Sequence, residues 1–181
     1  MTKRLRSALV LAALVSLAGC GNKQNSIEID HRMGERVTVG PLTYNVIESS
    51  WRSQLGEGFR VRVPQQRFLL ISISVTNGGG HQISMPLLSL ENSIGATFRE
   101  SDSGDGVGEW FGLLRNIDPA QTQQGRLVFD VPLGTYRLRL TNGSDAGTEK
   151  YAYVEIPLRM DGDSTVDSPL PSGTGVPDSV R

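Results

Sequence analysis

The segment RFLLISISVTNGGG, residues 67–80, decides the fold class of this chain of 181 residues. Apolar side chains alternate along it with polar ones, and the apolar set is Leu69, Ile71, Ile73 and Val75. A period of two places one apolar row on a single face of a β-strand and leaves the serines on the other. The Asn-Gly-Gly-Gly sequence that follows indicates a turn. We therefore predict a long strand with one buried face, as in antiparallel sheets.

Shorter alternating segments extend over the rest of the chain. They lie at residues 35–39, 42–49, 59–63, 88–90, 96–100, 112–117, 127–131, 136–140 and 152–158. Gly, Pro and Asn residues separate nearly every neighbouring pair, and no stretch shows a sustained helical period. We predict an all-β fold, an immunoglobulin-like antiparallel β-sandwich of about eight or nine strands over residues 35–159. A small closed barrel is the alternative architecture.

The first 20 residues carry the features of an export signal. Three basic residues within the first six precede an apolar run over residues 8–17, which is too short to cross a bilayer but typical of a secretory signal peptide. The sequence Leu17-Ala18-Gly19-Cys20 resembles the processing motif of bacterial lipoproteins. This resemblance implies removal of residues 1–19 and attachment of a diacylglyceryl group and an N-acyl chain to Cys20. An ordinary signal peptide or a buried cysteine is the alternative.

The two segments that flank the predicted domain are polar. Residues 20–34 begin with the lipidated cysteine and show little periodicity, so we predict a flexible tether. Residues 160–181 are rich in Ser, Asp, Gly and Pro and are predicted to be a disordered tail. Cys20 is the only cysteine of the chain, so no disulfide forms within one copy and the domain depends on its apolar core.

The order of these patterns resembles a known family. The segment at 67–80, the segment NIDPAQTQQGRLVFDVPLGTYRLRL at 116–140 and the closing YAYVEIPL at 151–158 follow the lipoprotein signal and polar linker. The arrangement resembles bacterial lipoproteins with an uncharacterised extracellular domain of telokin-like immunoglobulin fold, similar to a secreted mycobacterial immunoprotective antigen. The resemblance covers about residues 35–159 and implies that fold. The family has no established reaction, so the resemblance assigns no catalytic residue.

Few residues of the chain suit catalysis or metal binding. His31 and His81 have no second His or Cys at a ligand spacing, so no metal site is predicted. Ser164, in a hydrolase-like Gly-Asp-Ser sequence, has no histidine after it to act as a base. The acidic loop at 101–109 matches a calcium-binding loop poorly. We predict a protein that is not an enzyme and has no cofactor other than the lipid on Cys20.

Two features are candidates for a binding surface. Trp110 and Phe111 follow a Gly-rich loop, where an aromatic pair either recognises a partner or turns inward. Four arginines are expected on outward strand faces: Arg60, Arg62, Arg137 and Arg139. If their strands are neighbours, they form one patch for a phosphate, a carboxylate or an acidic partner. The alternative role of these charges is to keep a sheet face soluble and discourage aggregation.

The sequence predicts a cellular location and a class of function for the protein. A net charge of −1 gives no indication of a nucleic-acid partner. We predict a lipid-anchored cell-envelope lipoprotein that binds an unknown envelope or extracellular protein. An accessory subunit of an envelope transport or secretion assembly is the alternative. The anchor would hold it to the outer membrane of a Gram-negative cell, facing the periplasm or the surface, or to the outer face of a Gram-positive plasma membrane.

Overall fold

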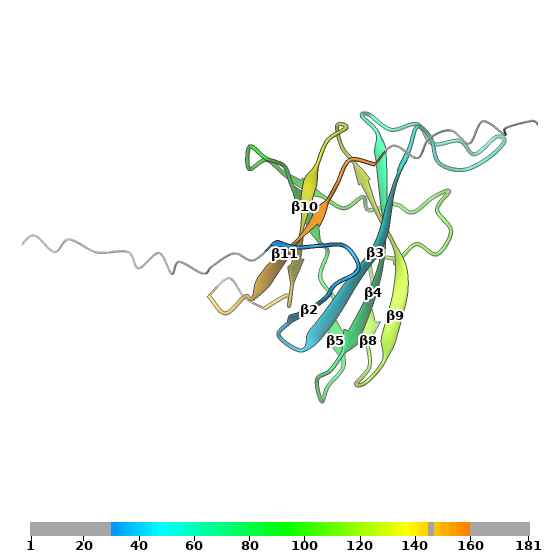
Figure 1. Ribbon diagram of the computed structural model, residues 1–181. Coiled ribbons are helices and arrows are strands. Elements are labelled where there is room, and N and C mark those ends of the chain that lie inside the picture. The colour runs from blue at the N-terminus through cyan, green and yellow to red at the C-terminus, as the bar shows by residue number, and fades with distance from the viewer. Residues whose placement is uncertain (1–29, 145–146, 160–181) are drawn as a thin grey trace, which may run out of the picture.

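Two β-sheets pack face to face in the computed structural model, which describes residues 30–144 and 147–159 (Figure 1). The first sheet has five strands in the spatial order β1 (Asp30–His31), β11 (Tyr151–Ile156), β10 (Tyr136–Thr141), β6 (Ser89–Glu91) and β7 (Thr97–Arg99). The second has four strands in the order β2 (Arg36–Val39), β3 (Leu42–Arg52), β4 (Phe68–Asn77) and β9 (Thr122–Asp130). A short pair, β5 (Ile83–Ser84) with β8 (Asn116–Ile117), completes the described strands.

The predicted all-β sandwich is confirmed. Eight of the described strands have three or more residues, and the other three have two each. Strand pairing is antiparallel except between β1 and β11. The alternation of apolar and polar residues therefore located most strands correctly, because most strands bury one face over most of their length.

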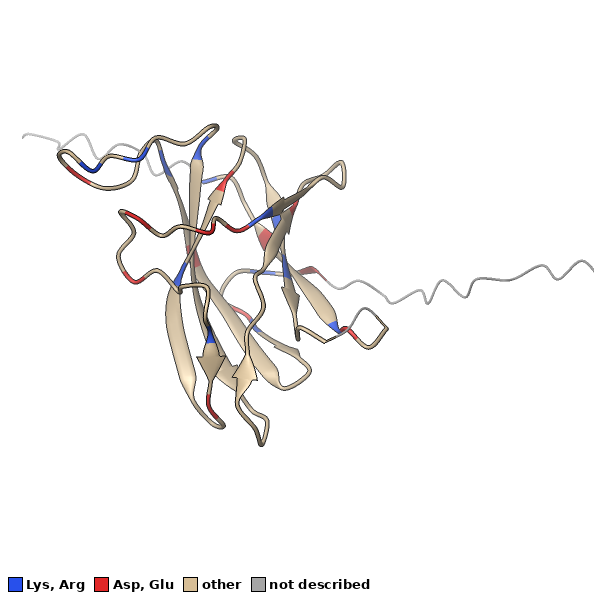
Figure 2. Cartoon of the chain, turned by 180° about the vertical axis from the view of Figure 1, so that it is seen from behind, with Lys and Arg blue, Asp and Glu red and all other residues tan. Residues whose placement is uncertain are grey.

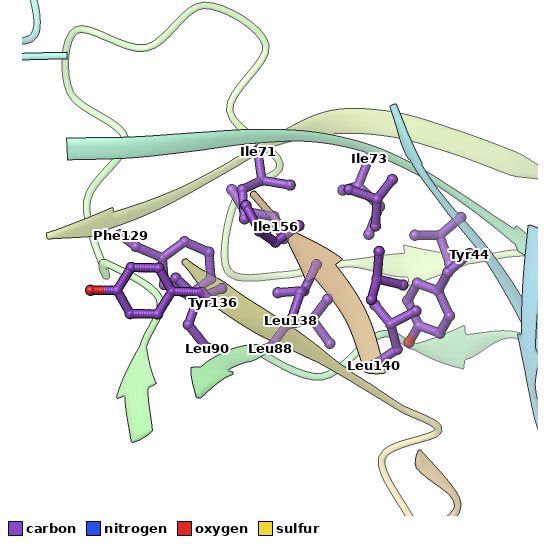
Figure 3. Packing of buried hydrophobic residues seen from close by; sticks show 14 of the residues in the cluster. Tyr44, Ile71, Ile73, Leu88, Leu90, Phe129, Tyr136, Leu138, Leu140 and Ile156 are labelled. Atoms are coloured by element: carbon purple, nitrogen blue, oxygen red, sulfur yellow. The ribbon is translucent and has the colours of Figure 1, made fainter. Parts of the chain in front are cut away.

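The core lies between the two sheets, and β4 is its central strand. β4 pairs over nearly its whole length with β3 on one side and with β9 on the other. Its four inward side chains, Leu69, Ile71, Ile73 and Val75, are completely buried. Figure 3 shows Ile71 and Ile73 facing Leu138, Leu140 and Ile156 of the opposite sheet. Each fully buried aliphatic side chain contributes about 1.5–3 kcal/mol, which suits a domain without disulfides.

The strand predicted at residues 59–63 is absent, and this prediction was wrong. These residues belong to the loop between β3 and β4, where Arg62 pairs with Leu55 through two backbone hydrogen bonds of 2.8 and 2.9 Å. Gly56 has a φ of 78°, and a side chain there would collide with the carbonyl oxygen of Arg60. Gly56 therefore bends the chain away from β3. Phe59 is fully exposed, so this alternation buries no face.

The described sandwich already includes Asp30 and His31, which lie before the predicted boundary at Glu35. Asp30 and His31 pair in parallel with Tyr153 and Val154 of β11. A strand of two residues is too short to give an alternating pattern. The polar sequence around it is therefore assigned to the tether. The predicted signal peptide (1–19), Cys20, the tether up to residue 29 and the tail at 160–181 lie outside the described residues.

A buried ion pair closes the long connection from β7 to β8. Glu100 follows β7 and Arg115 precedes β8, and both side chains are completely shielded from solvent. Their two hydrogen bonds measure 2.5 and 3.0 Å. Glu100 also accepts a hydrogen bond from the backbone N–H of Leu88, and Arg115 donates one to the carbonyl of Gly112, both at 2.5 Å. The pair thereby joins β7, the start of β6 and the segment before β8.

The connection enclosed by this ion pair covers the edge of β9. Ser101 donates its N–H to the carbonyl of Val128 at 2.7 Å, and Phe111 donates to Arg126 at 3.0 Å. A covered edge cannot pair with a strand of another molecule. The close approach requires Gly125, where a Cβ atom would lie 2.8 Å from the Phe111 ring and 3.1 Å from the Glu109 carbonyl oxygen.

We predict that Gly125→Ala destabilises the domain by about 1–3 kcal/mol, because the added methyl group forces the backbone of the connection away from β9. The measurement is equilibrium unfolding in urea, followed by tryptophan fluorescence. Gly134→Ala is the matched control, since its Cβ would have its closest neighbour at an ordinary 3.8 Å. Equal free energies of unfolding for the two variants would contradict this interpretation of the contact.

Candidate functional site

The four predicted arginines do not form one patch. Arg137 and Arg139 lie on β10 in the five-stranded sheet, whereas Arg60 and Arg62 lie in the loop beside the end of β3. Figure 2 shows basic residues of that loop gathered at the upper left, apart from those of β10. The single patch required the two segments to be neighbours in one sheet. The strand order places them in different parts of the molecule, so this expectation is corrected.

Arg62 is used to hold two loops together. It donates hydrogen bonds to the carbonyl oxygen of Ser103 at 2.8 Å and to the hydroxyl of Ser101 at 2.7 Å. Its guanidinium also lies 4.9 Å from the centre of the Phe68 ring. This side chain is therefore a structural contact between the β3–β4 loop and the connection after β7, while Arg60 remains exposed.

Trp110 and Phe111 pack against the two faces of the four-stranded sheet. Phe111 is partly buried against the main core. Trp110 packs on the outer face, against a second apolar cluster of Leu55, Phe68, Leu70 and Val128. Adjacent residues point in opposite directions here because the segment runs beside β9 in an extended conformation. The aromatic pair thus contributes to packing on both faces and lies apart from the arginines of β10.

Arg137 and Arg139 form a connected polar network on the outer face of the five-stranded sheet. Arg137 lies 4.3 Å from the centre of the Tyr153 ring, and Glu91 accepts hydrogen bonds from both, at 2.7 and 2.9 Å. Arg139 lies over Tyr151 at 4.4 Å. Each arginine therefore has an aromatic ring beneath it, an arrangement that restricts its motion.

Glu149 gives Arg139 a second set of contacts. Its carboxylate accepts two hydrogen bonds from Arg139, at 2.8 and 3.0 Å, and one from the Thr141 hydroxyl at 2.5 Å. The Arg139 guanidinium lowers the pKa of Glu149, and Arg137 lowers the pKa of Glu91 in the same way. Both carboxylates are therefore ionised at neutral pH, and the charges of this face compensate one another.

A groove opens beside this network, where β10 begins and β11 ends. Its volume is about 760 Å³, within the range of pockets that hold small molecules or peptide segments. Its lining comes from four segments that are far apart in the sequence: Arg32, Met33, Glu91, Asn92, Ser93, Thr135, Tyr136, Arg137, Glu155, Ile156, Pro157 and Arg159. Of the six surface residues proposed from the sequence, Arg137 lines this groove and the other five do not.

The groove combines an apolar floor with a charged rim. Met33 packs against the main core, and Tyr136 and Ile156 are part of it. Arg32 and Arg159 are exposed at the rim and have no ion-pair partner among residues 30–144 and 147–159. Sequence analysis missed both arginines because the groove forms only when β1 pairs with β11. β1 has two residues, which are too few to show the alternation that identifies a strand.

The described residues contain neither a possible metal cluster nor a helix that could span a membrane. Within residues 30–144 and 147–159, no three His, Cys, Asp or Glu side chains come together as a possible metal site. His31 is 3.1 Å from the carboxylate of Glu35. The same part of the chain contains no helix with the length and hydropathy needed to cross a bilayer.

A family model matches residues 31–152, which is well over half of the chain. The chain belongs to the family described as "Domain of unknown function (DUF4352)". The match begins at His31 in β1, before the predicted boundary at Glu35. No curated protein sequence matches this DUF4352 chain. The predicted resemblance to uncharacterised lipoprotein domains of immunoglobulin fold is confirmed.

Three crystal structures are similar to this DUF4352 domain. The yjhA protein of Bacillus subtilis is 16% identical, with 68% of this chain and 98% of that chain covered and a TM-score of 0.51. The predicted lipoprotein ycdA of Bacillus subtilis is also 16% identical, with 68% and 38% covered and a TM-score of 0.53. The secreted protein MPT63 of Mycobacterium tuberculosis is 14% identical, with 73% and 98% covered and a TM-score of 0.50. At these identities the similarity shows the fold alone.

Proposed function

We propose that this DUF4352 protein is an exported, lipid-anchored, non-enzymatic binding module of the cell envelope. In this proposal the groove between β1, β10 and β11 binds a segment of a partner protein that carries acidic and apolar side chains. The observation that carries the proposal is the composition of the groove, which places two arginines without an ion-pair partner in the described part of the chain around an apolar floor.

The excess of positive charge in the groove lining favours an acidic partner. The lining carries three arginines against two glutamates: Arg32, Arg137, Arg159, Glu91 and Glu155. Arg137 already shares its charge with Glu91 and Asp30, at 2.7 and 3.5 Å. Arg32 and Arg159 have no such partner in the described part of the chain. A carboxylate of a bound segment can therefore form charge-assisted hydrogen bonds with them without displacing an existing pair. The apolar surface of Met33 and Tyr136 would bury the aliphatic parts of the same segment.

The predicted anchor gives the module its location. Cys20 follows an export signal, and the descriptions of two proteins of similar fold, ycdA as a predicted lipoprotein and MPT63 as a secreted protein, support export. Ten residue steps separate Cys20 from Asp30, so the tether reaches about 35 Å when fully extended. A binding domain held this close to a membrane meets membrane-associated partners at a raised effective concentration.

We predict that Cys20→Ser abolishes lipid attachment, because a hydroxyl group does not replace the thiolate nucleophile. The measurement is metabolic labelling with a fatty acid, together with the mass of the mature chain. Gly21→Ser is the matched control, since it changes the neighbouring residue and keeps the thiol. Lipid label on the Cys20→Ser chain, with cleavage still after Gly19, would contradict the proposed anchor.

We predict that reversing the rim charges with Arg32→Glu and Arg159→Glu weakens partner capture at least about tenfold, the loss expected for a charge-assisted pair. The measurement compares proteins captured by the full-length variant and the wild type from detergent-solubilised envelope. The control reverses two exposed arginines outside the groove, Arg36→Glu and Arg99→Glu. Equal capture by both double variants would contradict a role for the groove.

A further inference from the structure

The loop at residues 53–67, between β3 and β4, presents apolar side chains to solvent. Phe59 is fully exposed, Val63 is 74% exposed and Val61 is 41% exposed. Single exposed apolar residues are common, but three of them at alternate positions around an aromatic side chain form a local patch. The fold gives this patch no partner within the described residues, since the second apolar cluster is formed by Leu55 and its neighbours.

The same loop is strongly basic. Residues 53–67 contain three arginines, at positions 60, 62 and 67, against a single acidic residue, Glu57, and Arg52 at the end of β3 adds a fourth. The connection packed against the base of the loop carries Asp102, Asp105 and Glu109, so the excess of positive charge belongs to the loop itself. Figure 2 shows basic residues along the loop at the upper left.

The base of the loop is held rigidly while its tip projects. Leu55 is buried and is bonded through its backbone to Arg62. Arg62 in turn bonds Ser101 and Ser103 of the neighbouring connection. Phe59 and Arg60 lie between these two fixed points. The loop is therefore fixed at Leu55 and at Arg62. These two contacts hold Phe59 away from the core and account for its exposure.

We propose that the 53–67 loop docks onto an anionic phospholipid bilayer. Phe59 and Val63 insert at the boundary between headgroups and acyl chains, and Arg60 binds lipid phosphate groups. A projecting loop with an exposed aromatic residue fits a deformable surface, which needs no preformed pocket to receive it. The excess of arginines provides attraction to the negative surface potential of such a membrane.

Docking of this loop would orient the domain that the proposed lipid anchor tethers. β3 has eleven residues and spans about 36 Å, and the loop continues from its end. A tether of ten residue steps reaches about 35 Å when fully extended, so it leaves the domain free to turn this loop toward the membrane that holds the lipid. This orienting role rests on the proposed function, whereas binding of the loop to lipid does not require the anchor.

The experiment uses the mature chain, residues 20–181, with Cys20→Ser so that it carries no lipid. Its binding is measured by flotation with vesicles of phosphatidylcholine, with and without phosphatidylglycerol. We expect the chain to bind the anionic vesicles, and we expect this binding to weaken as salt is raised. Excess glycerol phosphate should not displace the chain from the vesicles. Phe59→Ser should lower the partition coefficient about tenfold or more, and Arg60→Gln about fivefold.

Matched controls distinguish binding through this loop from nonspecific adsorption of the protein to vesicles. Ile94→Ser removes another exposed apolar side chain and Arg36→Gln another exposed charge, and both should bind as the wild type does. As a second readout, the fluorescence of Phe59→Trp should shift to shorter wavelength when anionic vesicles are added. No binding to anionic vesicles, or equal binding of Phe59→Ser and Ile94→Ser, would overturn the proposal. Such a result leaves the anchor intact, because fatty-acid labelling of the wild type tests that separately.

Discussion

The buried ion pair between Arg115 and Glu100 is the constraint on which the rest of this sandwich depends. Both charges are removed from water, so each has the other as its principal compensation, and loss of either leaves an uncompensated charge in the core. Their contacts fix the connection between β7 and β8 against the edge of β9. That connection receives the side chain of Arg62, which braces the 53–67 loop. Through the backbone of Leu88, the pair also fixes the start of β6, whose following turn lines the groove.

The outer surfaces divide the work of this DUF4352 domain among separate regions. On the five-stranded sheet, the charges of two arginines are compensated by two glutamates, and each guanidinium lies over a tyrosine ring. The hydrogen-bonding groups of this face are thus largely used within the domain. The neighbouring groove keeps two arginines without ion-pair partners in the described chain, and we propose that an acidic segment binds there. The 53–67 loop, on the other sheet, is basic and apolar together. We propose a binding module with a lipid anchor because that function would use both the groove and the loop.

The sequence predicts the sandwich well because the apolar residues that alternate along β4 and its neighbours face the core between the sheets, and alternation indicates that burial. It predicts poorly wherever the outcome depends on which segments become neighbours. Residues 59–63 alternate as a strand does, but the turn at Gly56 removes them from the sheet. From the sequence alone, Arg115 and Glu100 are expected at the surface, because charged residues are rarely buried unless they are paired. Their pairing across the connection cannot be seen in the sequence. The groove needs β1, and two residues are too few to reveal a strand.

The most direct measurement of the central claim is the free energy of unfolding of Glu100→Leu alone and of Glu100→Leu combined with Arg115→Met. The single variant leaves the guanidinium buried without its carboxylate and should lose about 3–5 kcal/mol. The double variant removes both charges and should regain a substantial part of that loss, because no charge remains uncompensated in the core. A single variant within about 1 kcal/mol of the wild type, or a double variant less stable than the single one, would contradict the account.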